Sequence, residues 1–287
     1  MSVVLITGCS SGIGLATALH FARLGDEVYA GVRSPTTATE LTRAIQVEGL
    51  PIHPVGLDVD DPASVNRGVG DVLHRSARVD VLVNNAGIGG GGAIEDVPVD
   101  WAKSLLETNY FGAIRMTQAV LPGMRERRSG TIVNVTSIAG RLAIAGHGHY
   151  SAVKHALEAA SEALAQEVLA SGIRVAIVEP GVVVTPIFTK AKRFSDASSP
   201  YAVHVHRLLL FYQMQVKLAS QPADVARVIH HAVTTDAPKI RYLVGDDARR
   251  LVAGRLRMSD EDYVETGRPM SDDEYLAMMR RSYGFDW

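Results

Sequence analysis

Cysteine is almost absent from this chain of 287 residues, which contains only Cys9. A single thiol can form neither a disulfide within the chain nor a thiolate metal cluster. His147 and His149 stand close together, as do His230 and His231, but no acidic or cysteine cluster has a spacing that suits a metal. We therefore expect no metal site, and we expect Cys9 to be a small packed residue.

A strong charge of either sign is also missing, because 29 basic and 31 acidic residues leave a net charge of −2. No long-range field results, so we expect neither nucleic acid nor a membrane surface as a partner. The first residues, MSVVLITG, lack the positive region and cleavage site of a signal peptide. The apolar stretch 173–188 is broken by Glu179, Pro180 and Pro186. We therefore expect a cytoplasmic protein without a membrane span.

Short runs rich in β-branched residues alternate with helix-like segments along most of the chain. Such alternation predicts right-handed crossovers and a parallel sheet covered on both faces. The fold class expected is therefore α/β, with a doubly wound parallel sheet of about seven strands. We expect strands at 3–7, 27–32, 52–57, 79–83, 131–135, 173–178 and 240–244, and helices at 12–24, 37–47, 62–76, 99–127, 150–170 and 223–233.

A glycine-rich turn, TGCSSGIG at 7–14, connects the first strand to the first helix. In this context Gly8 permits a tight turn, Gly12 lets the backbone approach a pyrophosphate, and Gly14 allows close packing of helix on sheet. The N-terminus of the helix adds free N–H groups and a dipole that favours phosphate. The turn therefore predicts a dinucleotide site.

The end of the second predicted strand indicates which dinucleotide binds. An acidic residue there would bind the ribose 2′-hydroxyl of NAD, whereas an arginine accommodates the 2′-phosphate of NADP. The position is occupied by Arg33, and Ser11 could add a hydroxyl donor to the same phosphate. We therefore favour NADP(H) over NAD(H), with an ordinary surface arginine as the alternative interpretation of Arg33.

Several further motifs occur in one order along residues 3–245, and together they resemble the short-chain dehydrogenase/reductase family. The spacing TGxxxGxG is followed by NNAG at 84–87, NxxG beginning at Asn109, Ser137 after the fifth strand, YxxxK formed by Tyr150 and Lys154, and PGxVxT at 180–185. The glycine turn and the segment VYAGVR resemble the NADP-preferring 17β-hydroxysteroid and retinol dehydrogenase branch. The resemblance implies a single Rossmann-like domain and a homodimer or homotetramer formed through the helices at 99–127 and 150–170.

The same resemblance implies a set of cofactor contacts. Asp58 would hold the adenine amino group, with Val59 beside it, and residues 85–87 would line the adenosine ribose. Pro180, Gly181, Val183 and Thr185 would bracket the nicotinamide. The full set implied is Gly8, Ser10, Ser11, Gly12, Ile13, Gly14, Arg33, Asp58, Val59, Asn85, Ala86, Gly87, Tyr150, Lys154, Pro180, Gly181, Val183 and Thr185.

Hydride transfer is the chemistry of such a cofactor, so the protein must supply orientation and a proton. Tyr150 is the candidate acid, and the candidate base in the oxidative direction. A free phenol has a pKa of about 10, and we expect Lys154, one helical turn on, to lower it and to hold the nicotinamide ribose. Ser137 would donate to the substrate oxygen, and the lack of a GxSxG elbow argues against Ser137 as a nucleophile. The family role of Asn109 is a water relay from Lys154, with a satisfied core asparagine as the alternative.

Apolar residues near these positions predict a lipophilic substrate. Residues 142–145, together with Ile187, Phe188 and the run 208–212, could wall a pocket, and one of His147 or His149 could touch substrate. The glycine-rich segment 87–93 is expected to be a mobile rim. We expect a catalytic domain at 1–250 with a lid at 185–221, although the run 208–212 could equally be a helix packed on the domain or on another subunit. The tail at 251–287 could be a solvated appendage, a flap or an interface arm.

These observations predict an NADP(H)-dependent oxidoreductase that interconverts a secondary alcohol and a ketone, or an alcohol and an aldehyde. A non-catalytic NADP(H)-sensing protein on the same fold is the alternative. A sugar-nucleotide epimerase would need a longer chain and the wider glycine spacing TGxxGxxG, neither of which is present.

Overall fold

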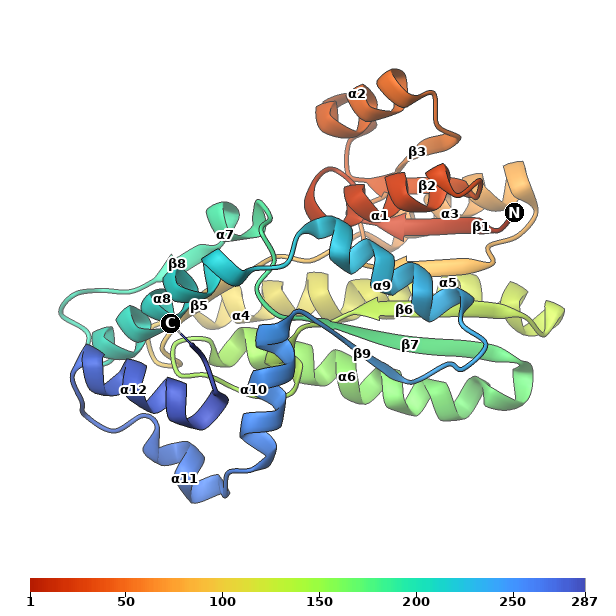
Figure 1. The fold of residues 1–287 in the computed structure, drawn as a ribbon. Coiled ribbons are helices and arrows are strands. Elements are labelled where there is room, and N and C mark those ends of the chain that lie inside the picture. Colours follow the sequence, from red (N-terminus) through yellow and green to blue (C-terminus); the bar gives the residue numbers. More distant parts are fainter. Residues whose placement is uncertain (287) are drawn as a thin grey trace.

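Seven parallel strands form the centre of the protein in a computed structural model (Figure 1). The structure describes residues 1–286; at residue 217 it describes the backbone alone. The strands run in the order β3-β2-β1-β4-β6-β7-β9. The sheet order reverses between β1 and β4, and ligands of doubly wound sheets bind at such a point. Their bounds are β1 Val3–Thr7, β2 Glu27–Val32, β3 Ile52–Gly56, β4 Val81–Asn84, β6 Gly130–Val135, β7 Ile173–Pro180 and β9 Arg241–Val244.

Helices cover both faces of this sheet, as the alternation of elements predicts (Figure 1). In β1, Val4 and Ile6 join one apolar cluster, whereas Val3 and Leu5 join another, because successive strand residues face opposite sides. The first cluster includes residues of α1 (Gly12–Arg23), α2 (Thr39–Glu48) and α9 (Pro222–Thr234). The second includes residues of α3 (Pro62–Ser76), α5 (Gly112–Arg127) and α6 (Gly148–Val168).

The predicted fold class is confirmed, since all seven expected strands are present in one parallel sheet. The ends of these strands and of five of the six expected helices lie within two residues of the predicted positions. The sixth helix, expected at 99–127, is instead interrupted. It consists of α4 (Val99–Leu106), a π-helical turn (Glu107–Phe111) and α5. Such turns are rare and often stand at functional sites, and Asn109 lies at the centre of this one.

The glycine-rich segment expected as a loose rim contains a short strand, β5 (Gly90–Gly92), which pairs with β8 (Lys192–Phe194) of the lid segment. The glycines allow a close approach of backbones here. A Cβ atom at Gly92 would lie 2.5 Å from the carbonyl oxygen of Phe194, and one at Gly90 would lie 2.8 Å from Nε1 of Trp101. Glycine is therefore required by packing at these positions.

The lid segment and the C-terminal segment pack against each other beyond the carboxyl ends of the strands (Figure 1). The lid contains α7 (Ile187–Lys190) and α8 (Ala202–Gln215), and the C-terminal segment contains α10 (Asp246–Leu256), α11 (Asp260–Glu265) and α12 (Asp272–Tyr283). A third apolar cluster joins them and includes Phe211 of α8, Leu251 of α10 and Met279 of α12. Between residues 1 and 286, no helix is both long and apolar enough to cross a membrane.

Candidate active site

A cavity of about 570 Å³ opens at the carboxyl edge of the sheet. Its walls come from the glycine turn, from the ends of β4, β6 and β7, from the start of α6 and from the lid. Every residue of the predicted cofactor set lines this cavity except Gly14, and so does Ser137. A Cβ atom at Gly14 would lie 2.3 Å from the carbonyl oxygen of Gly8, so this residue serves close packing behind the turn.

The glycine turn has the backbone shape of a phosphate cradle. Gly8 and Gly12 have φ angles of +74° and +61°, which residues with a Cβ atom rarely adopt. Asn85 holds the turn from β4, because its Nδ2 donates to the carbonyl oxygens of Thr7 at 2.9 Å and Gly8 at 3.3 Å. Cys9 is buried within the turn, and burial raises the pKa of its thiol. The Cys9 thiol is therefore neutral and packed in the interior, as expected.

The polar groups around the cradle fit a phosphate-bearing dinucleotide. Ser11 is the N-cap of α1, but its side chain makes no capping hydrogen bond and stays available to a ligand. Arg33 lines the cavity, is exposed, and forms no ion pair with any acidic residue in the described part of the chain. A helix N-terminus, a free hydroxyl and an unpaired guanidinium together suit an anion.

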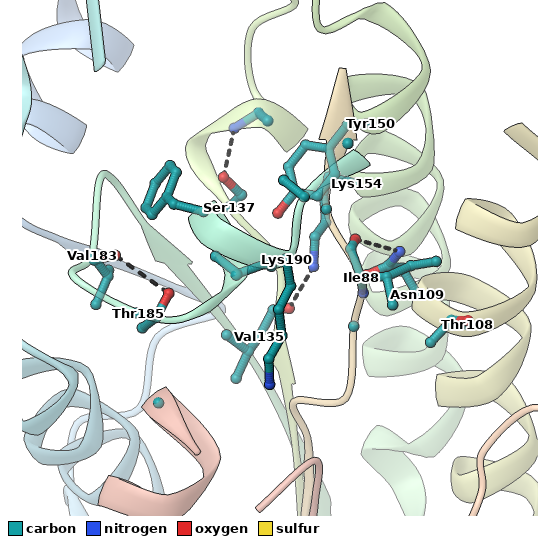
Figure 2. A pocket seen from close by; sticks show the side chains of 18 of the residues that line it. Ile88, Thr108, Asn109, Val135, Ser137, Tyr150, Lys154, Val183, Thr185 and Lys190 are labelled. Atoms are coloured by element: carbon teal, nitrogen blue, oxygen red, sulfur yellow. Dashed lines mark hydrogen bonds between the residues drawn. The ribbon is translucent and has the colours of Figure 1, made fainter. Parts of the chain in front are cut away.

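Ser137 and Tyr150 face the same end of the cavity from different elements (Figure 2). Ser137 follows β6, where its Oγ accepts a hydrogen bond from the N–H of Ala139 at 3.1 Å. Tyr150 lies in the first turn of α6, and the Ser137 hydroxyl donates a hydrogen bond to the carbonyl oxygen of Pro180 at 3.4 Å. Lys154 projects from the next turn, with Nζ 5.7 Å from the centre of the Tyr150 ring, and donates to the carbonyl oxygen of Val135 at 3.1 Å.

Burial controls the protonation of this pair. It raises the pKa of Tyr150 to about 12, against a smaller lowering by the Ser137 hydroxyl. It also lowers the pKa of Lys154 to about 8, against a raising effect of the Glu158 carboxylate. The expected lowering of the phenol pKa by Lys154 is therefore not found in the protein alone, because burial is the largest effect on the phenol and Lys154 is not among the groups that shift its pKa. Tyr150 is a protonated donor at neutral pH.

A buried ionic network that the sequence did not reveal lies behind Lys154. Glu158 accepts a hydrogen bond from Oγ1 of Thr136 at 2.5 Å and from Nε of Arg241 at 3.0 Å. Glu179 is fully buried and pairs with Arg141 at 3.0 Å and with Arg241 at 3.3 Å. In the sequence, this network is indicated only by the position of Glu158 four residues after Lys154, since residues at this spacing share a helix face.

Asn109 joins the π-helical turn to the segment after β4. Its Nδ2 donates to the carbonyl oxygens of Ile88 at 3.1 Å and Leu105 at 2.9 Å, and its Oδ1 accepts from the N–H of Ile88 at 3.2 Å (Figure 2). Both amide hydrogens are therefore used within the protein. These bonds position the rim of the cavity, and the water-relay role of Asn109 stays a prediction.

Of the two histidines before Tyr150, only His147 lines the main cavity. Its ring is stacked on the Tyr150 ring, with centres 4.6 Å apart and planes 11° apart. The Tyr212 hydroxyl of α8 lies 3.3 Å from Nδ1 of His147. His149 instead places Nε2 3.4 Å from the carbonyl oxygen of Ile94, outside this cavity.

The rest of the cavity wall beside Tyr150 is largely apolar. Within the segment 142–145, Leu142 and Ile144 line the cavity, whereas Ala143 and Ala145 are exposed. The lid adds further apolar surface, and its helix α8 both walls the cavity and packs on the domain through Phe211. The apolar residues of the lid that line the cavity include Ile187, Phe188, Val205, Leu208, Leu209 and Phe211.

The segment Pro180–Gly181–Val182 is held in place by residues near the C-terminus, which the sequence did not predict. Oδ2 of Asp247 accepts a hydrogen bond from the N–H of Val182 at 2.7 Å, and the carbonyl oxygen of Val244 accepts from the N–H of Gly181 at 2.9 Å. Gly181 admits this contact, since a Cβ there would lie 2.3 Å from Asp247. The first turn of α10 is therefore part of the support of the cavity.

With this geometry in view, comparison with known proteins identifies the family. A family model described as short chain dehydrogenase matches residues 2–196. The protein belongs to the short-chain dehydrogenase family. This confirms the family resemblance seen in the sequence, and membership supports a dehydrogenase or reductase activity.

Three similar proteins extend this finding. Human 17-beta-hydroxysteroid dehydrogenase type 1 is 34% identical over 295 residues, which cover 99% of this chain and 86% of the human protein. The crystal structure of a short-chain dehydrogenase from Streptomyces avermitilis is 38% identical, with a TM-score of 0.81 and coverage of 100% of this chain and 99% of the other. An alcohol dehydrogenase from Thermococcus sibiricus, solved with 5-hydroxy-NADP, is 25% identical with a TM-score of 0.71, covering 85% and 96% of the two chains.

Proposed function

We propose that this protein is an NADP(H)-dependent oxidoreductase that interconverts a lipophilic ketone and a secondary alcohol, or an aldehyde and a primary alcohol. One observation carries the proposal: the hydroxyls of Ser137 and Tyr150 stand in one cavity between a phosphate cradle and an apolar wall. A ligand that fills both halves would place its carbonyl at these hydroxyls.

The choice of NADP(H) is supported by the free guanidinium of Arg33 and the free hydroxyl of Ser11 on the adenosine side of the cradle. The Thermococcus sibiricus relative binds 5-hydroxy-NADP, which agrees with this choice. Lys154, Asn85 and Thr185 line the cavity where the rest of the dinucleotide would lie. When bound, the reduced cofactor supplies a hydride.

The proton and its placement are the work of the protein. Ser137 and Tyr150 donate hydrogen bonds to the carbonyl oxygen and stabilise the negative charge that develops on it. Tyr150 then transfers its proton to that oxygen, which its raised pKa permits because the phenol is fully protonated at neutral pH. The ammonium of Lys154 stabilises the resulting phenolate, and Asn109 is the candidate for a relay that returns a proton from solvent.

Three further expectations belong to this proposal. We infer that residues 1–250 carry the cofactor site and the chemistry, with residues 185–221 as the lid and residues 251–287 as an additional segment behind it. We also infer assembly as a homodimer or homotetramer through the helices at 99–127 and 150–170, and a cytoplasmic location. Sedimentation of the purified protein tests the assembly, since a monomer would contradict it.

The experiment that tests the function follows NADPH oxidation over steroids, retinoids, acyl carriers and simple ketones, with NADH as the control. We expect turnover of at least one lipophilic carbonyl compound and a clear preference for NADPH. Tight NADPH binding without turnover of any compound would instead favour the alternative of a non-catalytic sensor.

A further inference from the structure

Two side chains beside Tyr150 have polar atoms that the proposed reaction does not use. His147 stacks on the Tyr150 ring, and Tyr212 approaches His147 edge-on with ring centres 6.1 Å apart. Both line the cavity, and they come from different parts of the chain, the start of α6 and the lid helix α8. Any substrate whose carbonyl meets Tyr150 must therefore pass close to this pair.

The hydrogen bond between His147 and Tyr212 leaves one polar hydrogen of these two side chains without an acceptor. The contact between Nδ1 of His147 and the Tyr212 hydroxyl is the single hydrogen bond that either side chain makes with the part of the chain in view, residues 1–286. If Tyr212 donates, the Nε2–H of His147 lacks an acceptor, and if Nδ1–H donates, the Tyr212 O–H lacks one. The pair presents one unused donor in either tautomer.

The environment of the pair selects the kind of acceptor. Burial lowers the pKa of His147 to about 4 and raises the pKa of Tyr212, so both groups are neutral at neutral pH. The wall that α8 contributes next to Tyr212 is apolar and includes Leu208, Leu209 and Phe211. A carboxylate would lose its solvation here without gaining a positive partner from the pair, whereas a carbonyl or hydroxyl oxygen would gain a hydrogen bond.

We propose that His147 and Tyr212 form a second polar subsite, which binds an oxygen one or two carbons from the reacting carbonyl of the substrate. The inference rests on the proposed function, because Tyr150 defines the position of the reacting oxygen. The centres of the stacked His147 and Tyr150 rings are 4.6 Å apart. Donors on the edges of these rings therefore suit two oxygens carried by neighbouring carbons of one substrate molecule. The substrate class is therefore a lipophilic ketone with a second, uncharged oxygen at the α or β carbon.

The test compares two ketones of equal length, ethyl 3-oxooctanoate, which carries a β-oxygen, and 6-undecanone, which does not. For each, kcat/KM with NADPH is measured in the unchanged enzyme and in His147→Phe, which keeps an aromatic ring for the stack and removes both nitrogens. Tyr212→Phe removes the other donor and serves if His147→Phe does not fold. His149→Phe is the matched control, because His149 is outside the cavity.

We expect His147→Phe and Tyr212→Phe to lower the preference for the oxo ester by about 5–10-fold, the worth of one hydrogen bond, and His149→Phe to leave it unchanged. Comparing ratios between variants cancels the greater intrinsic reactivity of the oxo ester. An unchanged ratio in the first two variants would overturn the subsite, and so would an equal loss on both ketones, which would mean that His147 acts only by holding Tyr150.

A binding measurement separates this inference from the proposed function. The Kd of each ketone is measured by calorimetry with the enzyme saturated with NADP⁺, where no reduction occurs. If the unchanged enzyme reduces neither ketone, the proposed function fails on these compounds, yet the Kd ratio and its loss in His147→Phe still decide the subsite. Equal Kd values for the two ketones, or no binding of either, would overturn it.

Discussion

The charge on Lys154 is set by two opposing effects of neighbouring groups. Loss of solvation lowers its pKa to about 8, while the carboxylate of Glu158, one turn further along α6, raises it. Lys154 is therefore charged below pH 8 and neutral above it. In the proposed function the ammonium stabilises the Tyr150 phenolate, so we expect activity to depend on pH in this range.

A change at Glu158 should move this dependence. We expect kcat/KM for carbonyl reduction to fall as pH rises through about 8, and Glu158→Gln to shift the midpoint to lower pH, because a negative charge that favours the ammonium is lost. Glu162→Gln is the control, since Glu162 also pairs with Arg241 but is half exposed and is not among the groups that shift the pKa of Lys154. Equal pH profiles for both variants would rule out Glu158 as the group that sets the charge of Lys154.

Arg33 should decide between the two dinucleotides. We expect Arg33→Asp to raise KM for NADPH by about 10–100-fold, the cost of losing charge-assisted hydrogen bonds, and to leave KM for NADH equal or lower. Arg43→Asp changes an exposed arginine of α2 that does not line the cavity, and should change neither value. Retained selectivity for NADPH in Arg33→Asp would refute the role given to Arg33.

Residues with a strong local signature could be predicted from the sequence, because their spacing is part of a motif. The glycine turn, Ser137, Tyr150 and Lys154 are of this kind, and the structure brings them to one cavity. Asp247 and the pair of His147 with Tyr212 could not be predicted. Their roles depend on contacts between segments far apart in the sequence, and no local pattern encodes such contacts.

At the scale of elements, the first turn of α10 supports the segment after β7. Asp247 is buried and accepts from the N–H of Val182, while its neighbour Asp246 is exposed to solvent and pairs with Arg250. The family resemblance implies that Pro180, Gly181 and Val183 bracket the nicotinamide. A change at Asp247 therefore acts on the cofactor through the backbone of this segment.

This support leads to a test with a built-in comparison. We expect Asp247→Ala to raise KM for NADPH about tenfold, because the Val182 N–H loses a charged acceptor and the segment loosens. Asp247→Asn keeps an acceptor oxygen and should recover most of this loss, while Asp246→Ala should behave like the unchanged enzyme. If Asp247→Ala loses only stability while KM stays constant, Asp247 has no positioning role.

The strands could be predicted because buried parallel strands are continuous apolar runs, and the helices because their apolar residues recur with helical spacing. Two local features broke this simple pattern. The π-helical turn at Glu107–Phe111 adds one residue to a turn without disturbing the helical spacing enough to be seen. The strand β5 consists of three glycines, which carry no β propensity and pair only because β8 of the lid reaches them.

At the scale of the whole molecule, the C-terminal helices complete the fold around the cavity. The third apolar cluster contains Ile138 and Leu142 from beside Ser137, Val182 from the segment after β7, and Leu251 of α10. The described part of the C-terminal segment, residues 251–286, is thus packed against the site, so its loss would disturb the cavity as well as the stability.

Substitution of two leucines of α10 tests how much this cluster contributes to the free energy of unfolding. Leu251 is fully buried, whereas Leu256 is 74% exposed. We expect Leu251→Ala to lower the free energy of unfolding by about 2–5 kcal/mol, and Leu256→Ala to change it by about 0.5 kcal/mol or less. Urea unfolding of both variants provides the measurement, and similar losses at the two positions would show that the cluster does not stabilise the fold.

The central claim is that a protonated Tyr150 delivers the proton in a reaction driven by a bound nicotinamide. Its most direct test is Tyr150→Phe, which removes one oxygen atom and keeps the ring that stacks on His147. We expect Tyr150→Phe to lower the rate of NADPH-dependent carbonyl reduction by about 10²–10⁴-fold and to change the Kd for NADPH little. Carbonyl reduction by Tyr150→Phe at the rate of the unchanged enzyme would contradict this claim.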